Sequence, residues 1–423
     1  MSGPLPRHLL PDSSSVDADG QLLIAGLRAT DLAAELGTPL FVYDEEHLRT
    51  RCREAVAGFG DGVAYAAKAF LCRAMAQLVH EEGMYIDVAS GGELYVARSA
   101  GVPADRLVLH GNNKSIIELR QALREGVGRI VIDSFDELDR LDRLHGDGER
   151  VPDVLIRVTP GVDAQTHEFV ATGQNDSKFG FTVSTGTAQI AVERAIASPS
   201  VNVVGVHAHV GSQVFRIESF FESVKIIGAF AAPLGLPELS IGGGLGVPYV
   251  EGEEAPSIPQ WAAAVRRACE SAGVTARVSA EPGRSIAAAA AITLYTVGTI
   301  KEIPGVRTYV SVDGGMSDNP RPVLYGSGYE TFLPRSVDAA RGRTVTVVGK
   351  HCESGDRLVV DASGRVDTAV GDILATPVTG AYGHSMGSNY NKILRPPVVF
   401  VRDGRATVVV RRERYEDLIR LDV

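Results

Sequence analysis

Short apolar runs alternate with longer amphipathic segments from Val63 to Arg284. The apolar runs are rich in β-branched residues and predict strands, whereas the longer segments repeat apolar residues at helical spacing. Eight strands are expected, at Val63–Tyr65, Met84–Val88, Leu107–His110, Ile130–Ile132, Val154–Val158, Val203–Ala208, Leu239–Ile241 and Ala276–Ala280. Helices are expected between them, for example at Ala74–Glu82, Gly92–Ala100 and Ile116–Glu125. Eight strand–helix units over about 240 residues fit a (β/α)8 barrel of the TIM type.

A doubly wound open sheet is the alternative fold for this alternation. The strand ends favour the barrel, because a barrel brings the carboxyl ends of all its strands to one rim. Polar or glycine-rich clusters stand at these ends: Lys68, Asp87–Ser90, His110–Asn112, Asp133, Arg157, His207 with His209, Gly242–Gly244 and Glu281–Arg284. The sequence therefore predicts one site on one rim of a barrel.

The pattern changes after Ser285. Strand-like runs separated by Gly, Asp and Pro turns follow, at Val310–Asp313, Thr344–Val348, Arg357–Val360, Val398–Val401 and Ala406–Arg411. They predict a mostly β second domain, a barrel or a sandwich, that ends with a helix at Glu413–Ile419. Before the barrel, the sequence predicts an irregular arm or short edge strand at Leu9–Ala29, a helix at Thr30–Leu36 and a strand at Leu40–Tyr43. We expect the barrel to span residues 40–285 and the β domain to combine residues 1–39 with 286–423.

Composition narrows the function classes. The net charge of −10 argues against nucleic acid or an anionic membrane as the main partner, because both select a basic surface. The four cysteines lack disulfide-framework or zinc spacing, which favours a reducing cytoplasm. No apolar signal segment is evident at the N-terminus. The most apolar stretch, Ile286–Val297, is too short to span a bilayer and is expected to pack in the core.

Lys68 lies at the end of an apolar strand within Tyr-Ala-Ala-Lys-Ala. A lysine at a strand end is usually a solvated cap. Here small residues surround it and the rim location fits a half-buried ammonium, whose pKa falls so that it becomes a Schiff-base nucleophile.

Two motifs after late strands suit a phosphorylated ring. Gly242–Gly244 let backbone N–H groups approach a phosphate, although a tight turn explains some of these glycines. In Glu281-Pro282-Gly283-Arg284, the carboxylate suits a pyridine nitrogen and the guanidinium suits a phosphate or a substrate carboxylate. A structural Arg–Glu pair is the alternative.

His207 and His209 alternate along one strand, so both point to the same face. His-x-His is also a metal-ligand spacing, but a barrel hydrolase would add further ligands, and we expect no metal. The preferred role stacks one imidazole on the cofactor ring.

Two motifs of the β domain remain. Cys352, followed by Glu353, becomes a general acid if the site places it over a carbanion, and it is otherwise a small buried side chain. Tyr382, in Gly-Ala-Tyr-Gly, offers a hydroxyl to a phosphate, or is an ordinary loop aromatic.

Together these motifs resemble the fold-type III pyridoxal-phosphate decarboxylases and, within them, the diaminopimelate decarboxylases. The resemblance covers essentially the whole chain. It rests on YAAKA, HVGSQ, GGGLG, EPGR, DGGMSDNPRPVLYG, CESGD and GAYG, in that order.

The resemblance implies a role for each matching residue. Pyridoxal 5'-phosphate is the expected cofactor, with Lys68 bound to it covalently, His209 stacked on its ring and Glu281 on the ring nitrogen. The expected cofactor-binding residues are Lys68, Asp87, His209, Ser212, Gly243, Gly244, Glu281, Gly283, Arg284 and Tyr382. The expected substrate-binding residues are Arg284, Arg321, Tyr325, Glu353 and Tyr382. Cys352 is expected to be the proton donor and to reach the site from a second subunit of a homodimer.

The expected reaction is decarboxylation of meso-2,6-diaminopimelate to L-lysine and carbon dioxide, the last step of lysine biosynthesis. Other substrates of this fold stay open: ornithine, arginine, carboxynorspermidine and carrier-bound or secondary-metabolite amino acids. An alanine-racemase-like enzyme is a further alternative, but Glu281 argues against it. A non-enzymatic binding protein is another, although it would be expected to lack Lys68 or Cys352. The polar loop Val162–Lys178 is a candidate lid.

Overall fold

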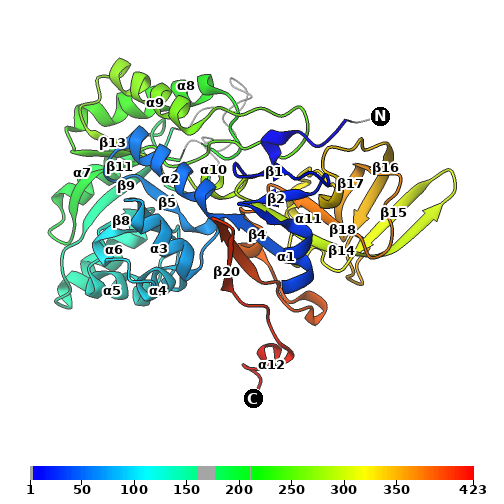
Figure 1. Cartoon of the computed structure of the whole chain (residues 1–423). Helices are drawn as coiled ribbons and strands as arrows, with labels where there is room; N and C mark the ends of the chain where they lie inside the picture. Colours follow the sequence, from blue (N-terminus) through cyan, green and yellow to red (C-terminus); the bar gives the residue numbers. More distant parts are fainter. Residues whose placement is uncertain (1–2, 161–176, 210) are drawn as a thin grey trace. The chain divides into compact units, whose positions relative to one another are not determined.

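A computed structural model describes residues 3–160, 177–209 and 211–423. The candidate lid lies almost entirely outside the described residues. The chain forms two compact units (Figure 1), which we call the β unit and the barrel unit. The β unit comprises Met1–Thr50, Val247–Glu254 and Ile286–Val423, and the barrel unit comprises Arg51–Gly246 and Ala255–Ser285.

The barrel unit contains the eight expected strands. They are β5 (Ala64–Ala66), β6 (Tyr85–Val88), β7 (Leu107–Leu109), β8 (Arg129–Ile132), β9 (Asp153–Thr159), β11 (Asn202–His207), β12 (Glu238–Ser240) and β13 (Arg277–Ser279). Each is parallel to its neighbour in this order. The Ala64 amide donates to Ala280 O at 2.9 Å and the Ala66 amide to Pro282 O at 3.1 Å, which joins the first strand to the chain leaving the last. The (β/α)8 barrel is confirmed.

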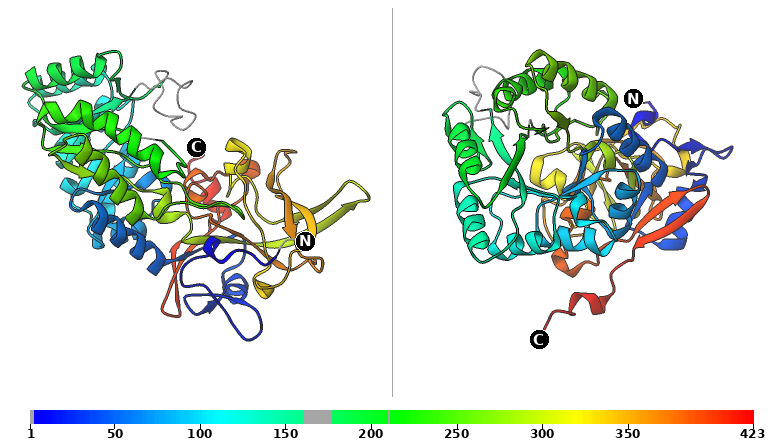
Figure 2. Two further views of the ribbon diagram at one scale, coloured as in Figure 1. Left: turned by 90° about the horizontal axis from the view of Figure 1, so that it is seen from above. Right: turned by 90° about the vertical axis from the view of Figure 1, so that its left-hand side faces the viewer.

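Helices surround these strands, as the right-hand view of Figure 2 shows. They are α3 (Arg73–Glu81), α4 (Gly91–Ser99), α5 (Ile116–Glu125), α6 (Phe135–Gly146), α7 (Thr187–Ala197), α8 (Ile217–Ala231), α9 (Ile258–Ser271) and the short α10 (Arg284–Ala287). The helix α2 (Glu45–Phe59) precedes β5, and the short β10 (Phe181–Thr182) pairs with β9.

Serine caps explain where several helices begin. Ser90, Ser115, Ser134 and Ser257 each accept a hydrogen bond from the amide three residues later, at the starts of α4, α5, α6 and α9. A serine followed three residues later by Glu or Gln is the sequence signature of such a start. Ser90 and Ser134 stand two residues after the ends of β6 and β8, so these two caps fix the helix entries beside the strand ends where polar clusters lie.

The β unit contains a sheet of order β17-β16-β15-β14-β4-β19-β20, with β18 also paired to β14. Its strands are β4 (Leu40–Asp44), β14 (Ala291–Ile303), β15 (Arg307–Val312), β16 (Arg343–Val348), β17 (Arg357–Gly364), β18 (Ile373–Pro377), β19 (Val398–Arg402) and β20 (Arg405–Val410). A small sheet of β1 (Ser15–Val16), β2 (Leu22–Ile24) and β3 (Leu27–Arg28) precedes α1 (Ala29–Leu36). The short helices α11 (Arg321–Tyr325) and α12 (Tyr415–Leu418) complete the unit.

The sheet of the β unit takes up β4, which pairs with β14 and β19. The apolar stretch Ile286–Val297 turns out to form α10 and the first half of β14. Its residues are largely buried, as expected, but the long strand was not predicted.

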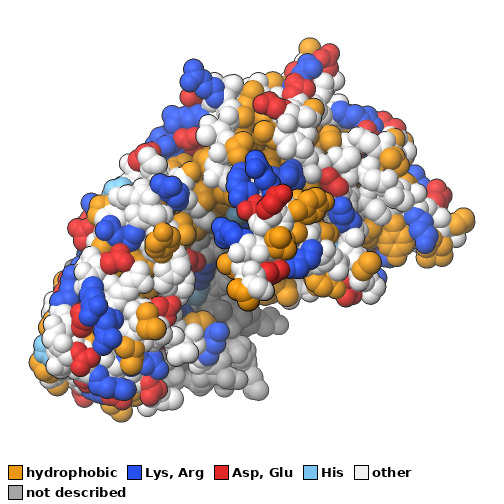
Figure 3. Space-filling model, turned by 90° about the horizontal axis from the view of Figure 1, so that it is seen from below, with side chains coloured by type: hydrophobic (Ala, Val, Ile, Leu, Met, Phe, Trp, Pro, Cys, Tyr) orange, Lys and Arg blue, Asp and Glu red, His pale blue; other side chains and the backbone are white. Residues whose placement is uncertain are grey.

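Charged side chains of both signs are interspersed on the face of the molecule shown in Figure 3. Among the described residues, none of the helices combines the length and the apolar character needed to cross a bilayer.

Candidate active site at the barrel rim

Three loops of the barrel unit approach one another at the ends of β11, β12 and β13. A Cβ atom on Gly242 would lie 2.5 Å from Ala208 O, and one on Gly243 would lie 2.5 Å from Glu281 O. One on Gly244 would lie 2.4 Å from Gly211 O. Gly242 and Gly244 also have positive φ, at 66° and 118°. Only glycine allows this approach, so the glycine run does more than form a tight turn.

Gly283 allows a similarly close approach of two segments on the next loop. A Cβ atom there would lie 2.9 Å from Ala66 Cβ and 3.0 Å from Ala66 O. The Glu281–Arg284 segment therefore passes close to the end of β5, directly before Lys68.

Glu281 is the centre of a buried hydrogen-bond network. The Ser240 hydroxyl donates to its Oε1 at 3.0 Å, and His207 Nε2 lies 2.9 Å from its Oε2. His110 Nε2 lies 3.3 Å from Oε1 and 3.7 Å from Asp87 Oδ1. All five side chains are less than 9% exposed. The carboxylate is therefore held in one orientation by three groups at the ends of β7, β11 and β12.

The charges in this network follow from burial and mutual contact. Burial raises the pKa of Glu281, but His207 and His110 outweigh it and bring that pKa well below its usual range. Burial lowers the pKa of His207 to about 4, so at neutral pH this ring is uncharged and donates Nε2–H to Glu281. Burial also lowers the pKa of His110, but Asp87 and Glu281 outweigh it and raise that pKa overall. Burial raises the pKa of Asp87. Glu281 is thus an ionised acceptor.

His209 follows the end of β11 and is also neutral. Burial, and then the charge of Lys68, lower its pKa well below the usual value. The Gly243 amide donates to its Nδ1 at 3.2 Å, which leaves the proton of the neutral ring on Nε2.

Lys68 lies in a short 3-10 turn, Ala67–Ala69, with buried neighbours on both sides. Its charge acts on both His209 and Asp87, so the lysine is close to the network. The lysine itself is exposed in this structure, which corrects the half-buried environment expected from the sequence.

Arg284 and Ser212 add donors beside the glycine run. Arg284 Nη2 donates to Ser212 Oγ at 3.2 Å. Both side chains reach solvent, Ser212 more than Arg284.

His207 and His209, which were expected on one face of a strand, lie in two different environments. His207 joins His110 and Glu281, and one ligand atom from each of these three residues lies within 4.8 Å of the others. His209 instead contacts the glycine loop. A His–His–Glu set has the composition of a cation site, but Glu281 Oε1 already accepts from the Ser240 hydroxyl and Oε2 lies 2.9 Å from His207 Nε2.

The rim suits a phosphorylated pyridine ring. It combines a lysine amine, an ionised and buried carboxylate, a neutral imidazole, and a glycine cradle with a guanidinium and a hydroxyl beside it. One buried ring nitrogen, His207 Nδ1, has no hydrogen-bond partner among the described residues. His110 was among the polar residues predicted at the strand ends. No role was predicted for Ser240, because a serine before a glycine turn is common.

The other predicted site residues belong to the β unit. Arg321 is buried, whereas Tyr325 is 67% exposed, at the end of the same short helix. Tyr382 is half-buried, has a positive φ of 63° and acts electrostatically on Arg321. Arg321 and Tyr382 are therefore neighbours, and Tyr325 points to solvent.

Cys352 and Glu353 form an exposed turn of the β unit. The Cys352 amide donates to Asn391 Oδ1 at 3.0 Å, and Glu353 Oε1 accepts from the Gly355 amide at 3.2 Å. Cys352 is thus an exposed thiol and not a buried small side chain.

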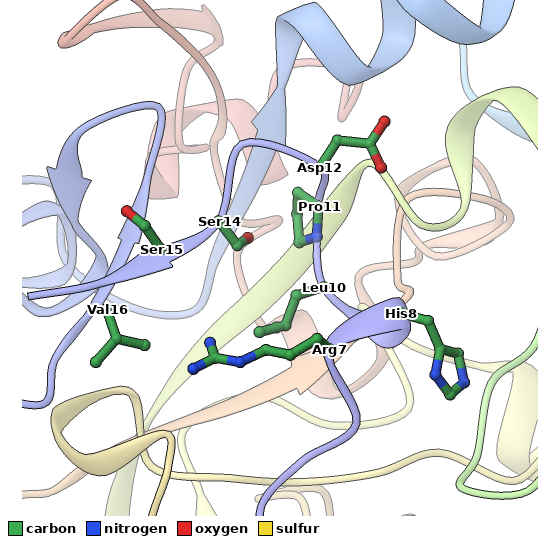
Figure 4. A pocket seen from close by; sticks show the side chains of 8 residues that line it. All are labelled: Arg7, His8, Leu10, Pro11, Asp12, Ser14, Ser15 and Val16. Atoms are coloured by element: carbon green, nitrogen blue, oxygen red, sulfur yellow. The ribbon is translucent and has the colours of Figure 1, made fainter.

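The β unit also has a pocket along its N-terminal segment (Figure 4), lined by Arg7, His8, Leu10, Pro11, Asp12, Ser14, Ser15 and Val16. Arg7 forms an ion pair with Asp338, and the Asp12 amide donates to His47 Nδ1 at 3.1 Å. The charge of Arg7 is therefore already balanced within the unit.

Known proteins match this chain over most of its length. Residues 45–288 match the family model of the pyridoxal-dependent decarboxylase pyridoxal-binding domain. The chain is 45% identical to diaminopimelate decarboxylase of Mycobacterium tuberculosis over 99% of this chain and 98% of that one. It is 44% identical to the Bacillus subtilis diaminopimelate decarboxylase over 98% of both.

A solved structure agrees as well. Diaminopimelate decarboxylase from M. jannaschii, crystallised with L-lysine, superposes with a TM-score of 0.91 at 32% identity, over 97% of this chain and 98% of that one. The cofactor of the enzyme is pyridoxal phosphate. The chain therefore belongs to the pyridoxal-dependent decarboxylases and, within them, to the diaminopimelate decarboxylase family.

Proposed function

We propose that the protein decarboxylates meso-2,6-diaminopimelate to L-lysine and carbon dioxide. The observation that carries this proposal is the full-length similarity to diaminopimelate decarboxylases, on a barrel rim that combines Lys68, an ionised Glu281 and a glycine cradle. A lysine/ornithine decarboxylase structure from Vibrio vulnificus is only 23% identical and shares the fold. Ornithine and related substrates are therefore not favoured.

Pyridoxal phosphate, when bound, supplies an electron sink for the electron pair that departing carbon dioxide leaves behind. The Lys68 amine is its attachment point. Glu281, ionised and fixed by Ser240 and His207, holds a proton at the ring nitrogen. The neutral His209 ring would pack against the ring of the bound cofactor.

The phosphate-binding residues are donors of the rim loops: the Ser212 hydroxyl, the Gly243, Gly244 and Gly283 amides and the Arg284 guanidinium, with the Tyr382 hydroxyl as a further donor. Asp87 completes the cofactor-binding set through His110. In an acidic chain, this local donor set is what attracts an anionic cofactor.

The proposed substrate-binding residues are Arg284 of the barrel unit and four side chains of the β unit. Arg321, with Arg284, binds the carboxylate that the substrate keeps, and Glu353 binds the distal ammonium group. Tyr325 and Tyr382 contribute hydroxyl groups. Losing one such charge pair would cost about 2–5 kcal/mol of binding free energy.

Cys352 Sγ would supply the proton that replaces carbon dioxide, and the Lys68 amine would hold the cofactor again once the product amine has left. Cys352 suits this role because its thiol is exposed on a turn, whereas Cys52, Cys72 and Cys269 are buried. Cys352→Ala should retain the cofactor and lose most of its turnover. Unchanged turnover would reject Cys352 as the proton donor.

The active unit is proposed to be a homodimer, in which one subunit supplies Lys68 and its partner supplies Cys352. The exposure of the Cys352–Glu353 turn is what supports this sharing. Mixing the inactive variants Lys68→Ala and Cys352→Ala tests it, because mixed dimers would contain one intact site. Recovered activity is the expected outcome, and none would mean that each chain forms its own site. The four cysteines form no disulfide within the described residues, which supports the expected cytoplasmic location.

The decisive assay incubates the purified enzyme, loaded with pyridoxal phosphate, with meso-diaminopimelate and measures L-lysine. Lys68→Ala is the matched control and should release none. Turnover of ornithine or arginine, without turnover of meso-diaminopimelate, would overturn the substrate while keeping the reaction class.

A further inference from the structure

Arg321 is a buried cation without an anionic partner in the described part of the chain. It is 5% exposed, and none of the described carboxylates lies within ion-pair distance of it. Arg341 of the same unit is the contrasting case, because it is equally buried and binds Glu330 at 2.6 Å and Glu251 at 3.1 Å. An unpaired buried charge is costly. The Arg321 guanidinium is therefore suited to bind an anion that is not part of the described structure.

Two tyrosines hold this guanidinium. Its Cζ lies 4.3 Å from the centre of the Tyr249 ring, and Nη1 donates to the Tyr329 hydroxyl at 2.9 Å. Nη2 donates to Ser327 Oγ at 3.1 Å. The two tyrosine rings meet edge to face, with centres 5.2 Å apart, and both are buried. These contacts fix the plane of the Arg321 guanidinium and leave one direction from which a ligand can reach its N–H groups.

The segments that carry these tyrosines are joined by the Arg341 ion pairs. Glu251 lies two residues after Tyr249, and Glu330 directly follows Tyr329. Arg341 binds both carboxylates, and the Glu251 amide donates to Glu330 Oε1 at 3.0 Å. Glu251 and Glu330 are thus occupied by Arg341, while Tyr249 and Tyr329 contact Arg321.

Aromatic neighbours suit a carboxylate receptor better than acidic ones. A glutamate beside Arg321 would compete with the carboxylate of a ligand, whereas a tyrosine face stabilises the cation without using its N–H groups. A guanidinium has five N–H donors, and Tyr329 and Ser327 each accept from one. Burial lowers the pKa of Arg321, but Tyr249 and Tyr329 outweigh it, so the pKa is raised overall and the group stays charged.

We propose that Tyr249 and Tyr329 are positioning residues, which fix the Arg321 guanidinium so that it recognises the carboxylate retained in the product. This inference rests on the proposed function. Diaminopimelate has two carboxylates, one of which leaves as carbon dioxide while the other remains in L-lysine. Cadaverine has the carbon chain and both amines of lysine but lacks that carboxylate. The two tyrosines should therefore matter for lysine and not for cadaverine.

The test measures the dissociation constants of L-lysine and cadaverine by calorimetry, with the enzyme loaded with pyridoxal phosphate. In Tyr329→Phe and in Tyr249→Leu, lysine binding should weaken about 10-fold, which is the loss expected for one contact to a charged group. Cadaverine binding should stay unchanged. The KM for diaminopimelate should rise by a similar factor with little change in kcat, because the reacting carboxylate is the other one.

Two variants control for structural damage. Tyr249→Phe keeps the aromatic face and should restore lysine binding to the wild-type value. Tyr309→Leu removes a tyrosine ring 6.0 Å from Arg307, elsewhere in the same unit, and should change neither ligand. Equal weakening of lysine and cadaverine would overturn the inference, and so would unchanged lysine binding in both tyrosine variants. Failure of the proposed function would instead appear in the wild-type enzyme, as absent turnover of meso-diaminopimelate.

Discussion

The ring of His351 and the carboxylate of Asp356 form a buried pair beside Cys352, with Nδ1 2.8 Å from Oδ2. Asp356 also accepts hydrogen bonds from the Met316 amide at 2.7 Å and the His351 amide at 3.0 Å. A Cβ atom on Gly315 would lie 2.6 Å from His351 Nδ1, so a glycine is needed where the two segments meet. One carboxylate thus ties the turn of Cys352 to the segment around Met316.

Replacing Asp356 should therefore destabilise the β unit and misplace the thiol. Asp356→Ala leaves two buried amides without an acceptor, which should lower the free energy of unfolding by about 2–5 kcal/mol. Urea titration measures this loss. In the milder Asp356→Asn, kcat should fall while the absorbance of bound cofactor persists. A normal kcat in a destabilised variant would show that the pair serves folding alone.

The sequence predicted the barrel well because the barrel strands are short, largely buried runs and several of the helices between them begin at a serine cap. It missed β14, whose first residues are buried on both faces and so form a continuous apolar run without alternation. Periodicity does not distinguish such a run from a buried helix. The register of β14 is set by its pairing with β4, β15 and β18, which the sequence does not show.

The sequence likewise predicts some residues of the candidate site and not others. Lys68, Glu281 and the glycine run stand at strand ends, where the barrel pattern places them on one rim. Tyr249 and Tyr329 stand in loops, where isolated aromatic residues carry no periodic signal. Their contact with Arg321 depends on tertiary structure between segments far apart in the chain.

Replacing only one member of a buried ion pair in the barrel unit should destabilise the protein. Lys114 Nζ lies 2.7 Å from Glu137 Oε1, both side chains are nearly inaccessible, and Lys114 also donates to Gly111 O and Val131 O. Glu137→Gln leaves a buried ammonium, which should lower the free energy of unfolding by about 3–5 kcal/mol. The double variant Lys114→Met, Glu137→Gln should lose less than the sum of the single losses. Strictly additive losses in urea titrations would contradict a direct coupling.

The neutral, buried His207 should make stability depend on acid. Its pKa is about 4 in the folded protein, because of burial, against an ordinary 6.5. Between these values the unfolded chain binds a proton that the folded protein does not, so stability rises with pH and is lost as pH falls from 6.5 to 4. The contribution is about 3 kcal/mol. In His207→Gln, the free energy of unfolding of the cofactor-free protein should change less over this window.

His384 of the β unit supplies the matched control, because burial lowers its pKa to about 4 as well. His384→Gln should flatten the same pH window without weakening cofactor binding. His207→Gln should flatten it and also weaken cofactor binding, because it disturbs the orientation of Glu281. Equal cofactor affinity in the two variants would argue against a role for His207 beside Glu281.

Thiol labelling should report the Cys352 turn directly. Cys52, Cys72 and Cys269 are buried, and burial raises the pKa of Cys269 to about 11, so these thiols should react slowly in the folded protein. Cys352 is exposed and should account for one fast-reacting thiol per chain, which disappears in Cys352→Ala. If the thiol faces the substrate, L-lysine should slow its labelling by iodoacetamide in the enzyme loaded with cofactor. Mass spectrometry identifies the modified residue, and a labelling rate that lysine does not change would place Cys352 outside reach of the ligand.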